Sequence, residues 1–193
     1  MKKIRVIIVE DQSIIREGLA AILSFQPDIE VVGQGKDGIE AVELLEKTHP
    51  DVILLDLVMP RQDGLTTIPI LKAKQPSVHI LVLSSFADNE HVYPAIKSGA
   101  EGYMLKDATH TQLLQGIRDV AQGQASLYPS IAMQVIREMG GDNFVMVCWE
   151  PPGDFCHRRV VAAWLRKYTG VLVEEFIPTM RRHAEWLRGI QAI

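Results

Sequence analysis

Cysteine is scarce in this sequence, and both copies lie near its end. Cys148 and Cys156 have seven residues between them, with His157 beside the second. Zinc sites normally group four ligands in close pairs, and the sequence offers no second pair here. A disulfide is not expected in a reducing cytoplasm. The two cysteines therefore predict free thiols, with neither a zinc centre nor a disulfide scaffold.

Long hydrophobic runs are also missing. No stretch approaches the roughly 20 consecutive apolar residues that a membrane-spanning helix needs. The Met-Lys-Lys start is not followed by the long apolar core of a signal peptide, and the sequence has no internal repeat or low-complexity segment. With 47% hydrophobic and 23% charged residues, the composition is that of a soluble globular protein. We therefore expect a cytoplasmic protein with no membrane association.

The formal net charge of −4 is unevenly distributed along the 193 residues. Residues 1–142 carry 13 Lys and Arg against 19 Asp and Glu, whereas residues 143–193 carry 7 against 5 and hold all three tryptophans. This length suits a main domain with an appendage. We expect an acidic main domain followed by a compositionally different tail. The mildly basic tail fits a segment that binds nucleic acid or a partner, or equally a solvated helix face.

Short β-branched runs alternate with helical patterns in the first part of the chain. This alternation is typical of an α/β fold with a parallel sheet covered on both faces. Apolar residues recur at helical spacing between the runs, as Leu113, Ile117 and Val120 do. Five strands are predicted, at 4–9, 30–33, 52–56, 79–84 and 102–105.

Two prolines lie inside predicted helices of this domain. Gly64 opens the third helix, and Pro69 and Pro94 lie one or two turns inside the third and fourth helices. Proline lacks a backbone donor and clashes with the preceding turn. We expect these helices to start late or kink, and the fourth helix to be short or irregular.

Polar side chains stand where four of the predicted strands end. Glu10 and Asp11 follow the first strand, Asp56 ends the third, Ser84 ends the fourth and Lys106 follows the fifth. The carboxyl ends of parallel strands meet at one edge of the sheet, where α/β proteins bind their ligands. Three acids, a hydroxyl and an ammonium should therefore gather in one place.

This set of groups suits phosphoryl chemistry. Three neighbouring carboxylates are unfavourable unless a cation lies among them or some are protonated. Magnesium prefers oxygen ligands and bridges carboxylates to phosphate oxygens. An ionised Asp56 can attack phosphorus in line and form an acyl phosphate, while Lys106 and Ser84 stabilise the phosphoryl oxygens. The pattern predicts Mg²⁺-dependent phosphoryl transfer to Asp56.

Each of these residues taken alone also has an ordinary structural explanation. An aspartate after a strand often forms a turn or a cap, a serine often bonds locally, and a single lysine usually faces solvent. The functional interpretation rests on the joint pattern, in which each group comes from a different strand at the same edge.

Five separated segments resemble the receiver domain of bacterial two-component response regulators, and the resemblance is close to the NarL/FixJ/LuxR-type subfamily. They are Val9–Asp11, Leu55–Pro60, Asp63–Gly64, Val82–Ser85 and Ala95–Asp107. The resemblance covers about residues 1–125 as the receiver domain. It extends more loosely over a linker helix, which we assign to residues 126–142.

The resemblance implies a flavodoxin-like (βα)5 fold with a five-stranded parallel sheet in the order 2-1-3-4-5. It implies that Asp56 is the phosphoacceptor. It also implies that Asp11, Asp56 and the Val58 carbonyl bind Mg²⁺ directly, with Glu10 assisting through water.

The remaining site residues follow from the same resemblance. Ser84 and Tyr103 correspond to the family's switch pair of a hydroxyl and an aromatic residue, and Lys106 to its phosphate-binding lysine. On physical grounds alone, Tyr103 is expected to be a half-buried strand aromatic. Its switch role rests on the resemblance.

The leading hypothesis is a response regulator that receives its phosphoryl group from a sensor histidine kinase and then changes conformation to control an output. It is a phosphoacceptor that catalyses its own phosphorylation and dephosphorylation, not an enzyme in the usual sense. The competing classes are a pseudo-receiver that serves only as an interaction module and a DNA-binding transcriptional regulator. A homodimer through the receiver helices is compatible with the first and third classes.

Residues 143–193 depart from the family pattern. Relatives with this receiver and linker usually continue into a helix-turn-helix domain, whose opening resembling Leu-Thr-x-Arg-Glu has no counterpart here. Helical patterns at about 156–168 and 172–190 predict a small, mostly helical tail. Three interpretations stay open: a divergent output or dimerisation module, a degenerate DNA-binding domain, or a segment whose reading frame changes near Gly140. DNA binding is therefore unsupported by the tail sequence.

Overall fold

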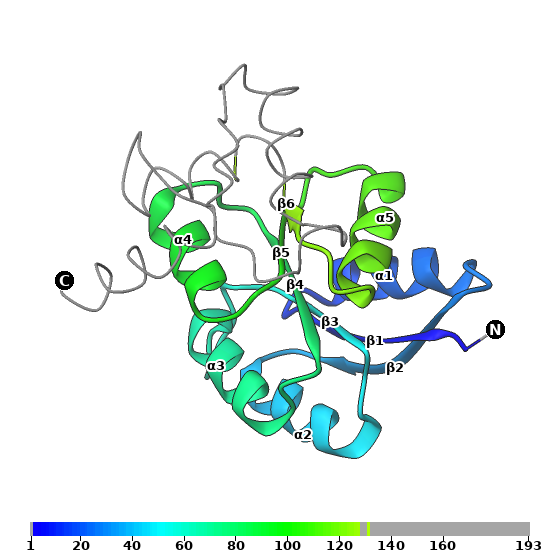
Figure 1. Cartoon of the computed structure of the whole chain (residues 1–193), viewed down its shortest axis with the longest axis horizontal. Coiled ribbons are helices and arrows are strands. Elements are labelled where there is room, and N and C mark those ends of the chain that lie inside the picture. Colours follow the sequence, from blue (N-terminus) through cyan, green and yellow to red (C-terminus); the bar gives the residue numbers. More distant parts are fainter. Residues whose placement is uncertain (1, 128–130, 132–193) are drawn as a thin grey trace, which may run out of the picture. The chain divides into compact units, whose positions relative to one another are not determined.

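An entirely parallel sheet lies at the centre of the structure, a computed structural model that describes residues 2–127 and 131 (Figure 1). Its strands lie in the order β2-β1-β3-β4-β5-β6. The strands are β1 (Ile4–Val9), β2 (Ile29–Gly35), β3 (Val52–Leu55), β4 (His79–Ser84), β5 (Gly102–Leu105) and β6 (Ser126–Leu127). The helices are α1 (Ser13–Ser24), α2 (Gly38–Thr48), α3 (Gly64–Lys74), α4 (Asn89–Lys97) and α5 (His110–Ala121).

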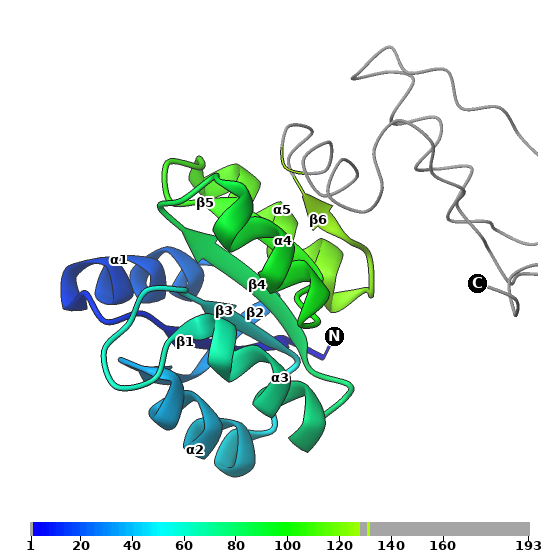
Figure 2. The same ribbon diagram turned by 90° about the vertical axis from the view of Figure 1, so that its left-hand side faces the viewer.

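Helices cover both faces of the sheet, as the two perpendicular views show (Figure 1 and Figure 2). Along β1, Ile7 and Val9 point into a hydrophobic cluster shared with α2, α3 and α4. Val6 and Ile8 point into the opposite cluster, shared with α1 and α5. Burial on both sides explains why the strands read as continuous apolar runs. The predicted α/β fold, with its flavodoxin-like order 2-1-3-4-5, is confirmed.

The sheet has one strand more than the five that the sequence predicts. β6 pairs in parallel with β5 through Gly102 with Ser126 and Tyr103 with Leu127. The Ser126 N–H donates to the Glu101 carbonyl at 3.1 Å. A strand of two residues is too short to show a periodic sequence pattern. β6 forms because the chain leaving α5 meets the open edge of β5. Ser126–Leu127 therefore belongs to the sheet and not to the predicted linker helix.

The two prolines affect their helices differently. α3 begins at Gly64, capped by the Asp63 carboxylate, which accepts from the Thr66 N–H at 2.7 Å. It runs through Pro69 to Lys74, so α3 does not start late, and the alternative of a kink at Pro69 stays a prediction. A proline at the sixth position removes only one hydrogen bond, and packing against the sheet holds the rest. α4 contains Pro94 and has nine residues, the fewest of the described helices, which confirms that it is short.

Within the described part of the chain, no helix is long and apolar enough to cross a membrane. Ile131 is helical and buried against the cluster under α2, α3 and α4. Residues 128–130 and 132–142 of the predicted linker helix lie outside the described residues. The tail at 143–193, with its two cysteines, lies outside them as well.

Candidate functional site

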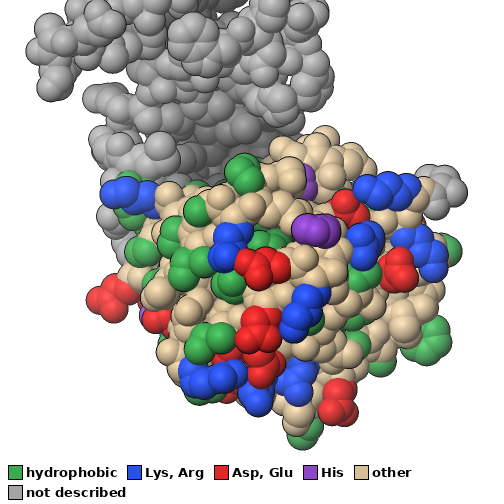
Figure 3. Space-filling model, turned by 90° about the horizontal axis from the view of Figure 1, so that it is seen from below, with side chains coloured by type: hydrophobic (Ala, Val, Ile, Leu, Met, Phe, Trp, Pro, Cys, Tyr) green, Lys and Arg blue, Asp and Glu red, His purple; other side chains and the backbone are tan. Residues whose placement is uncertain are grey.

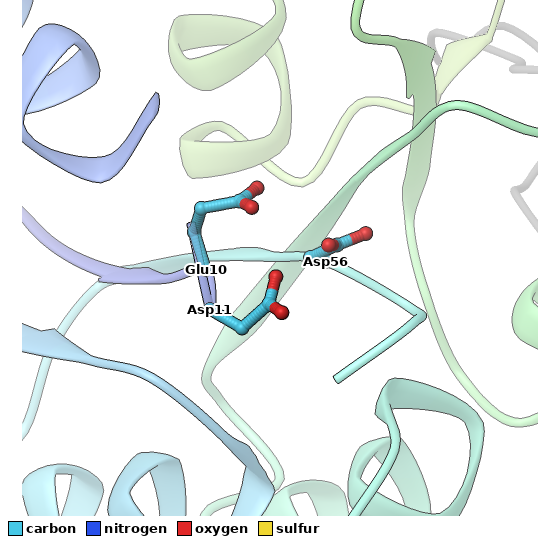
Figure 4. Close-up of side chains that lie close together, drawn as sticks. All are labelled: Glu10, Asp11 and Asp56. Carbon is cyan, nitrogen blue, oxygen red and sulfur yellow. The ribbon is translucent and has the colours of Figure 1, made fainter. Parts of the chain in front are cut away.

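Three carboxylates meet at the carboxyl edge of the sheet (Figure 4). Glu10 and Asp11 directly follow β1, and Asp56 directly follows the neighbouring strand β3. One oxygen of each carboxylate lies within 4.8 Å of one oxygen of each of the others. Glu10 and Asp56 are buried, whereas Asp11 is exposed. The three acids that the sequence predicts at this edge therefore lie together.

Lys106, which follows β5, lies between the two buried acids. Its Nζ donates to Asp56 Oδ2 at 2.8 Å and lies 2.7 Å from Glu10 Oε2. Burial lowers the pKa of Lys106, but hydrogen bonding and the charges of Asp56 and Glu10 outweigh burial and hold this pKa above its ordinary value. The ammonium therefore stays charged and neutralises part of the acidic site.

The Glu10 carboxylate is not fully satisfied by its neighbours. The Gln12 N–H donates to Oε1 at 3.2 Å, but the buried Oε2 has no hydrogen-bond donor of suitable geometry in the described structure. Burial raises the pKa of Glu10; Lys106 opposes this increase and the Asp56 charge adds to it, so the pKa lies above its ordinary value. A carboxylate whose only cationic partner among the described residues is an ammonium shared with Asp56, beside two further acids, fits a magnesium site, since Mg²⁺ takes oxygen ligands and water.

Asp56 is oriented by the loop that follows it, residues 57–63. Its Oδ1 accepts from its neighbour Leu57 N–H at 2.7 Å and lies 3.4 Å from the Val58 N. Oδ1 is thereby held by the backbone, while Oδ2 faces Lys106. Val58 lies in this loop with an exposed side chain, and its carbonyl as a metal ligand stays a prediction.

Gly64 brings the start of α3 against the backbone of the site. A Cβ on Gly64 would lie 2.4 Å from the Asp56 carbonyl oxygen and 2.8 Å from Leu57 Cα. The Gly64 N–H donates to the Leu57 carbonyl at 2.8 Å. Only a residue without a side chain permits this approach.

Ser84 and Tyr103 meet beside the loop that follows β4. Ser84 is completely buried, and its Oγ accepts from the Phe86 N–H at 3.2 Å. The Tyr103 hydroxyl donates to the Phe86 carbonyl at 2.7 Å. Tyr103 is also completely buried, so the half-buried position expected on physical grounds is wrong: its ring packs into the cluster under α2, α3 and α4, and burial raises its pKa.

Two residues of this region are missing from the sequence-based set. Arg16 Nη1 donates to the Glu10 carbonyl at 2.6 Å and so braces the turn that carries two of the acids. Phe86 joins Ser84 to Tyr103 through its backbone, and its ring stacks on His91 with centroids 4.5 Å apart. Because these contacts involve the backbone of Glu10 and Phe86, the residue types in the sequence do not reveal them.

A cavity of about 330 Å³ lies at the opposite end of the strands, beside Asp51 and His79. It shares no residue with the acid cluster. Figure 3 shows a face on which Lys and Arg side chains are mixed with Asp and Glu. No patch of a single sign gathers on the described part of that face.

Comparison with known proteins agrees with this geometry. Residues 6–118 match the family described as response regulator receiver domain. The transcriptional regulatory protein DegU of Brevibacillus brevis is 41% identical over 136 residues, which are 70% of this chain and 58% of DegU. The chain therefore spans less than two thirds of that relative.

Solved structures show the same similarity. The signal receiver domain of the response regulator NarL from Mycobacterium tuberculosis is 35% identical with a TM-score of 0.62, over 64% of this chain and all of that chain. The RcsB protein, in a structure of two RcsB dimers bound to two parallel DNAs, is 26% identical with a TM-score of 0.64. That match covers 70% of this chain and 69% of the RcsB chain.

Proposed function

This chain belongs to the response regulator receiver domain family, and from that premise we propose that it is a signalling protein that accepts a phosphoryl group on Asp56. The donor is the phosphohistidine of a sensor histidine kinase. The observation that carries the proposal is the position of Asp56, buried at the end of β3 with Lys106 at 2.8 Å and two further acids beside it.

In the proposed reaction, an Asp56 oxygen forms a bond to phosphorus while the bond from phosphorus to the histidine nitrogen breaks. The imidazole leaves with the electron pair of that bond. Lys106 stabilises the charge on the transferred group, because its ammonium is fixed beside Asp56 and its raised pKa keeps it charged. Hydrolysis of the acyl phosphate at the same site returns Asp56 to its starting form.

Magnesium belongs to the same proposal. Asp11 and Asp56, with the Val58 carbonyl, would hold the ion directly, and Glu10 would hold one of its waters. When bound, Mg²⁺ supplies positive charge to the phosphoryl oxygens. The burial of Glu10 and Asp56 and the closeness of the three carboxylates, with a single ammonium among them in the described structure, support this ligand set.

A conformational response through Ser84 and Tyr103 completes the proposal. A phosphoryl group on Asp56 adds nearly two negative charges and new acceptor oxygens next to β4. The Ser84 hydroxyl would turn toward them and give up its bond with the Phe86 N–H. Because the Phe86 carbonyl also holds Tyr103, the change would reach α4 and β5.

The test is phosphorylation of the full chain with Mg²⁺ and a small acyl phosphate, followed by intact-mass spectrometry. We expect one phosphoryl adduct on the wild type and on Asp107→Asn, a control acid that is exposed next to Lys106. We expect none on Asp56→Asn. An unmodified wild type, or an equal adduct on Asp56→Asn, would refute the assignment. Amide exchange on the same sample should change in α4 and β5, and unchanged exchange would refute the switch.

DNA binding is the second candidate, favoured by the relatives named as transcriptional regulators and by the RcsB dimers on DNA. A chain that binds DNA as the RcsB dimers do would also form a homodimer. Both candidate functions place the chain in the cytoplasm. Binding of duplex DNA that weakens steeply with salt and survives competition by unrelated DNA would support it. An intact acid site that takes up no phosphoryl group would instead indicate a pseudo-receiver.

A further inference from the structure

Asp37 is a completely buried carboxylate outside the acid cluster. It is the N-cap of α2, and its Oδ1 accepts from the Ile39 and Glu40 N–H groups, each at 3.0 Å. Its other oxygen, Oδ2, accepts from Arg61 Nε at 2.5 Å. Burial raises the pKa of Asp37, but the hydrogen bonds from Glu40 and Arg61 outweigh burial and hold it below its ordinary value. This buried carboxylate is therefore ionised, and Arg61 carries the compensating charge.

Arg61 reaches Asp37 from the loop between β3 and α3, which also carries Val58. Its backbone has φ of 63°, in the left-handed region that residues other than glycine seldom adopt. Its guanidinium also contacts Glu40 Oε1 at 3.2 Å. An unfavourable backbone conformation persists only where the surroundings hold it. Two kinds of contact hold Arg61 in the described structure: its guanidinium binds Asp37 and Glu40, and the Gln62 N–H donates to the Pro60 carbonyl at 2.7 Å across its backbone.

The next residue of the loop is also fastened to the start of α2. The Gln62 carbonyl accepts from the Gly38 N–H at 3.0 Å, and Gln62 Nε2 donates to Thr67 Oγ1 at 2.9 Å. A Cβ on Gly38 would lie 1.9 Å from Thr67 Oγ1 in α3 and 2.8 Å from Gln62 Nε2 in the loop, so the start of α2 packs against both without spare room. The loop is thus fixed at one end by Asp56 and at the other by α2.

We propose that the Asp37–Arg61 ion pair positions the loop at 57–63 and thereby sets the affinity of the acid site for Mg²⁺. Val58, the proposed carbonyl ligand, lies between the two fixed ends of this loop. Without the ion pair, the loop can leave its present conformation and move Val58 relative to Asp56. Asp37 and Arg61 are positioning residues, since neither contacts the acid cluster. The inference rests on the proposed function for its metal site.

The test measures Mg²⁺ binding to the full chain by titration calorimetry, with no phosphoryl donor present. We expect Arg61→Ala to weaken binding about tenfold, the lower end of the range for residues that orient metal ligands. The matched control is Lys74→Ala, because Lys74 in α3 pairs with Glu46 in α2 away from the loop. Binding to this control should match the wild type.

Arg61→Gly separates the ion pair from the backbone conformation, because glycine adopts a positive φ freely. We expect Arg61→Gly to lose affinity as Arg61→Ala does, and Arg61→Lys to retain part of it. Wild-type affinity in Arg61→Gly would overturn the proposal, since the ion pair would then be dispensable. If Arg61→Ala does not fold by circular dichroism, Asp37→Asn replaces it, because the amide oxygen can still cap α2.

The two proposals fail separately. A wild type that binds Mg²⁺ but gains no phosphoryl group would refute the proposed function and leave this inference standing. A wild type that is phosphorylated with Mg²⁺, while both Arg61→Ala and Arg61→Gly bind Mg²⁺ normally, would refute only the role of the ion pair.

Discussion

At the residue scale, burial gives the acid site its electrostatic character. Glu10 and Asp56 are nearly inaccessible to solvent, and one ammonium, Lys106, contacts both. Two buried negative charges with one positive charge leave an excess of negative charge. Burial raises the pKa of Glu10 and the charge of Asp56 adds to the increase, while the excess of negative charge attracts a divalent cation.

Replacement of Glu10 tests this electrostatic account. Because the pKa of Glu10 is raised in the folded state, protonated Glu10 stabilises the fold at pH values below its ordinary pKa. This stabilisation is lost as the pH rises through the folded-state pKa. In Mg²⁺-free buffer, Glu10→Gln should therefore have a higher free energy of unfolding than the wild type at pH 7. The difference should shrink as the pH falls toward the ordinary pKa of glutamate. Urea unfolding across this pH range measures the difference in free energy of unfolding. A difference that grows on acidification would contradict the argument.

At the element scale, the loop after β3 decides where Asp56 points. Its two ends are held by different means: the start of α3 approaches the Asp56 backbone closely at Gly64, and the start of α2 binds Gln62 and Arg61. The side chains of the site come from strand ends, but neighbouring helices set the geometry of the loop.

Gly64→Ala tests the close approach at α3. The added Cβ would overlap the Asp56 carbonyl and Leu57 Cα, and backbone atoms cannot move aside easily. We expect a loss of about 1–3 kcal/mol in the free energy of unfolding, the usual effect of overpacking. Phosphorylation of Asp56 should also slow.

The matched control for this change is Gly18→Ala in α1. A Cβ on Gly18 meets nothing within 4 Å, and alanine favours a helix by up to about 1 kcal/mol over glycine. Gly18→Ala should therefore be neutral or stabilising in the same urea experiment. Equal stability of the two variants would show that α3 can move away from Asp56 without cost.

At the scale of the whole molecule, the parallel sheet brings together residues that are far apart in sequence. The acids follow β1 and β3, which are neighbours in the sheet, and Lys106 follows β5 on the other side of β4. A ligand at this edge therefore joins the ends of several strands. Binding that requires the folded sheet must stabilise the whole domain.

Magnesium should for this reason raise the melting temperature of the chain. At a Mg²⁺ concentration 100 times its Kd, the free energy of unfolding should increase by about 2.7 kcal/mol. Calorimetric melting with and without MgCl₂ measures the effect, with NaCl at equal ionic strength as the salt control. Asp11→Asn removes a proposed ligand and should reduce the shift. An identical shift in NaCl would indicate general screening rather than a bound ion.

The sequence by itself determined the fold class and the identity of the polar groups at the strand ends, and the strand order followed from the family resemblance. Buried parallel strands require continuous apolar runs, and the polar residue that ends each run marks the edge of the sheet. The apolar run before Asp56 and the motif around Lys106 were therefore readable without coordinates. Their catalytic and switch roles stay predictions.

Only the tertiary structure decided the features that depend on contacts between distant segments. β6 forms because the edge of β5 is open, Tyr103 is fully buried because the cluster under α4 closes over it, and Asp37 meets Arg61 because α2 lies beside the loop after β3. None of these contacts repeats with a helix or strand period. Periodicity reports which face of an element is buried, whereas the partner on that face is set by how the elements pack.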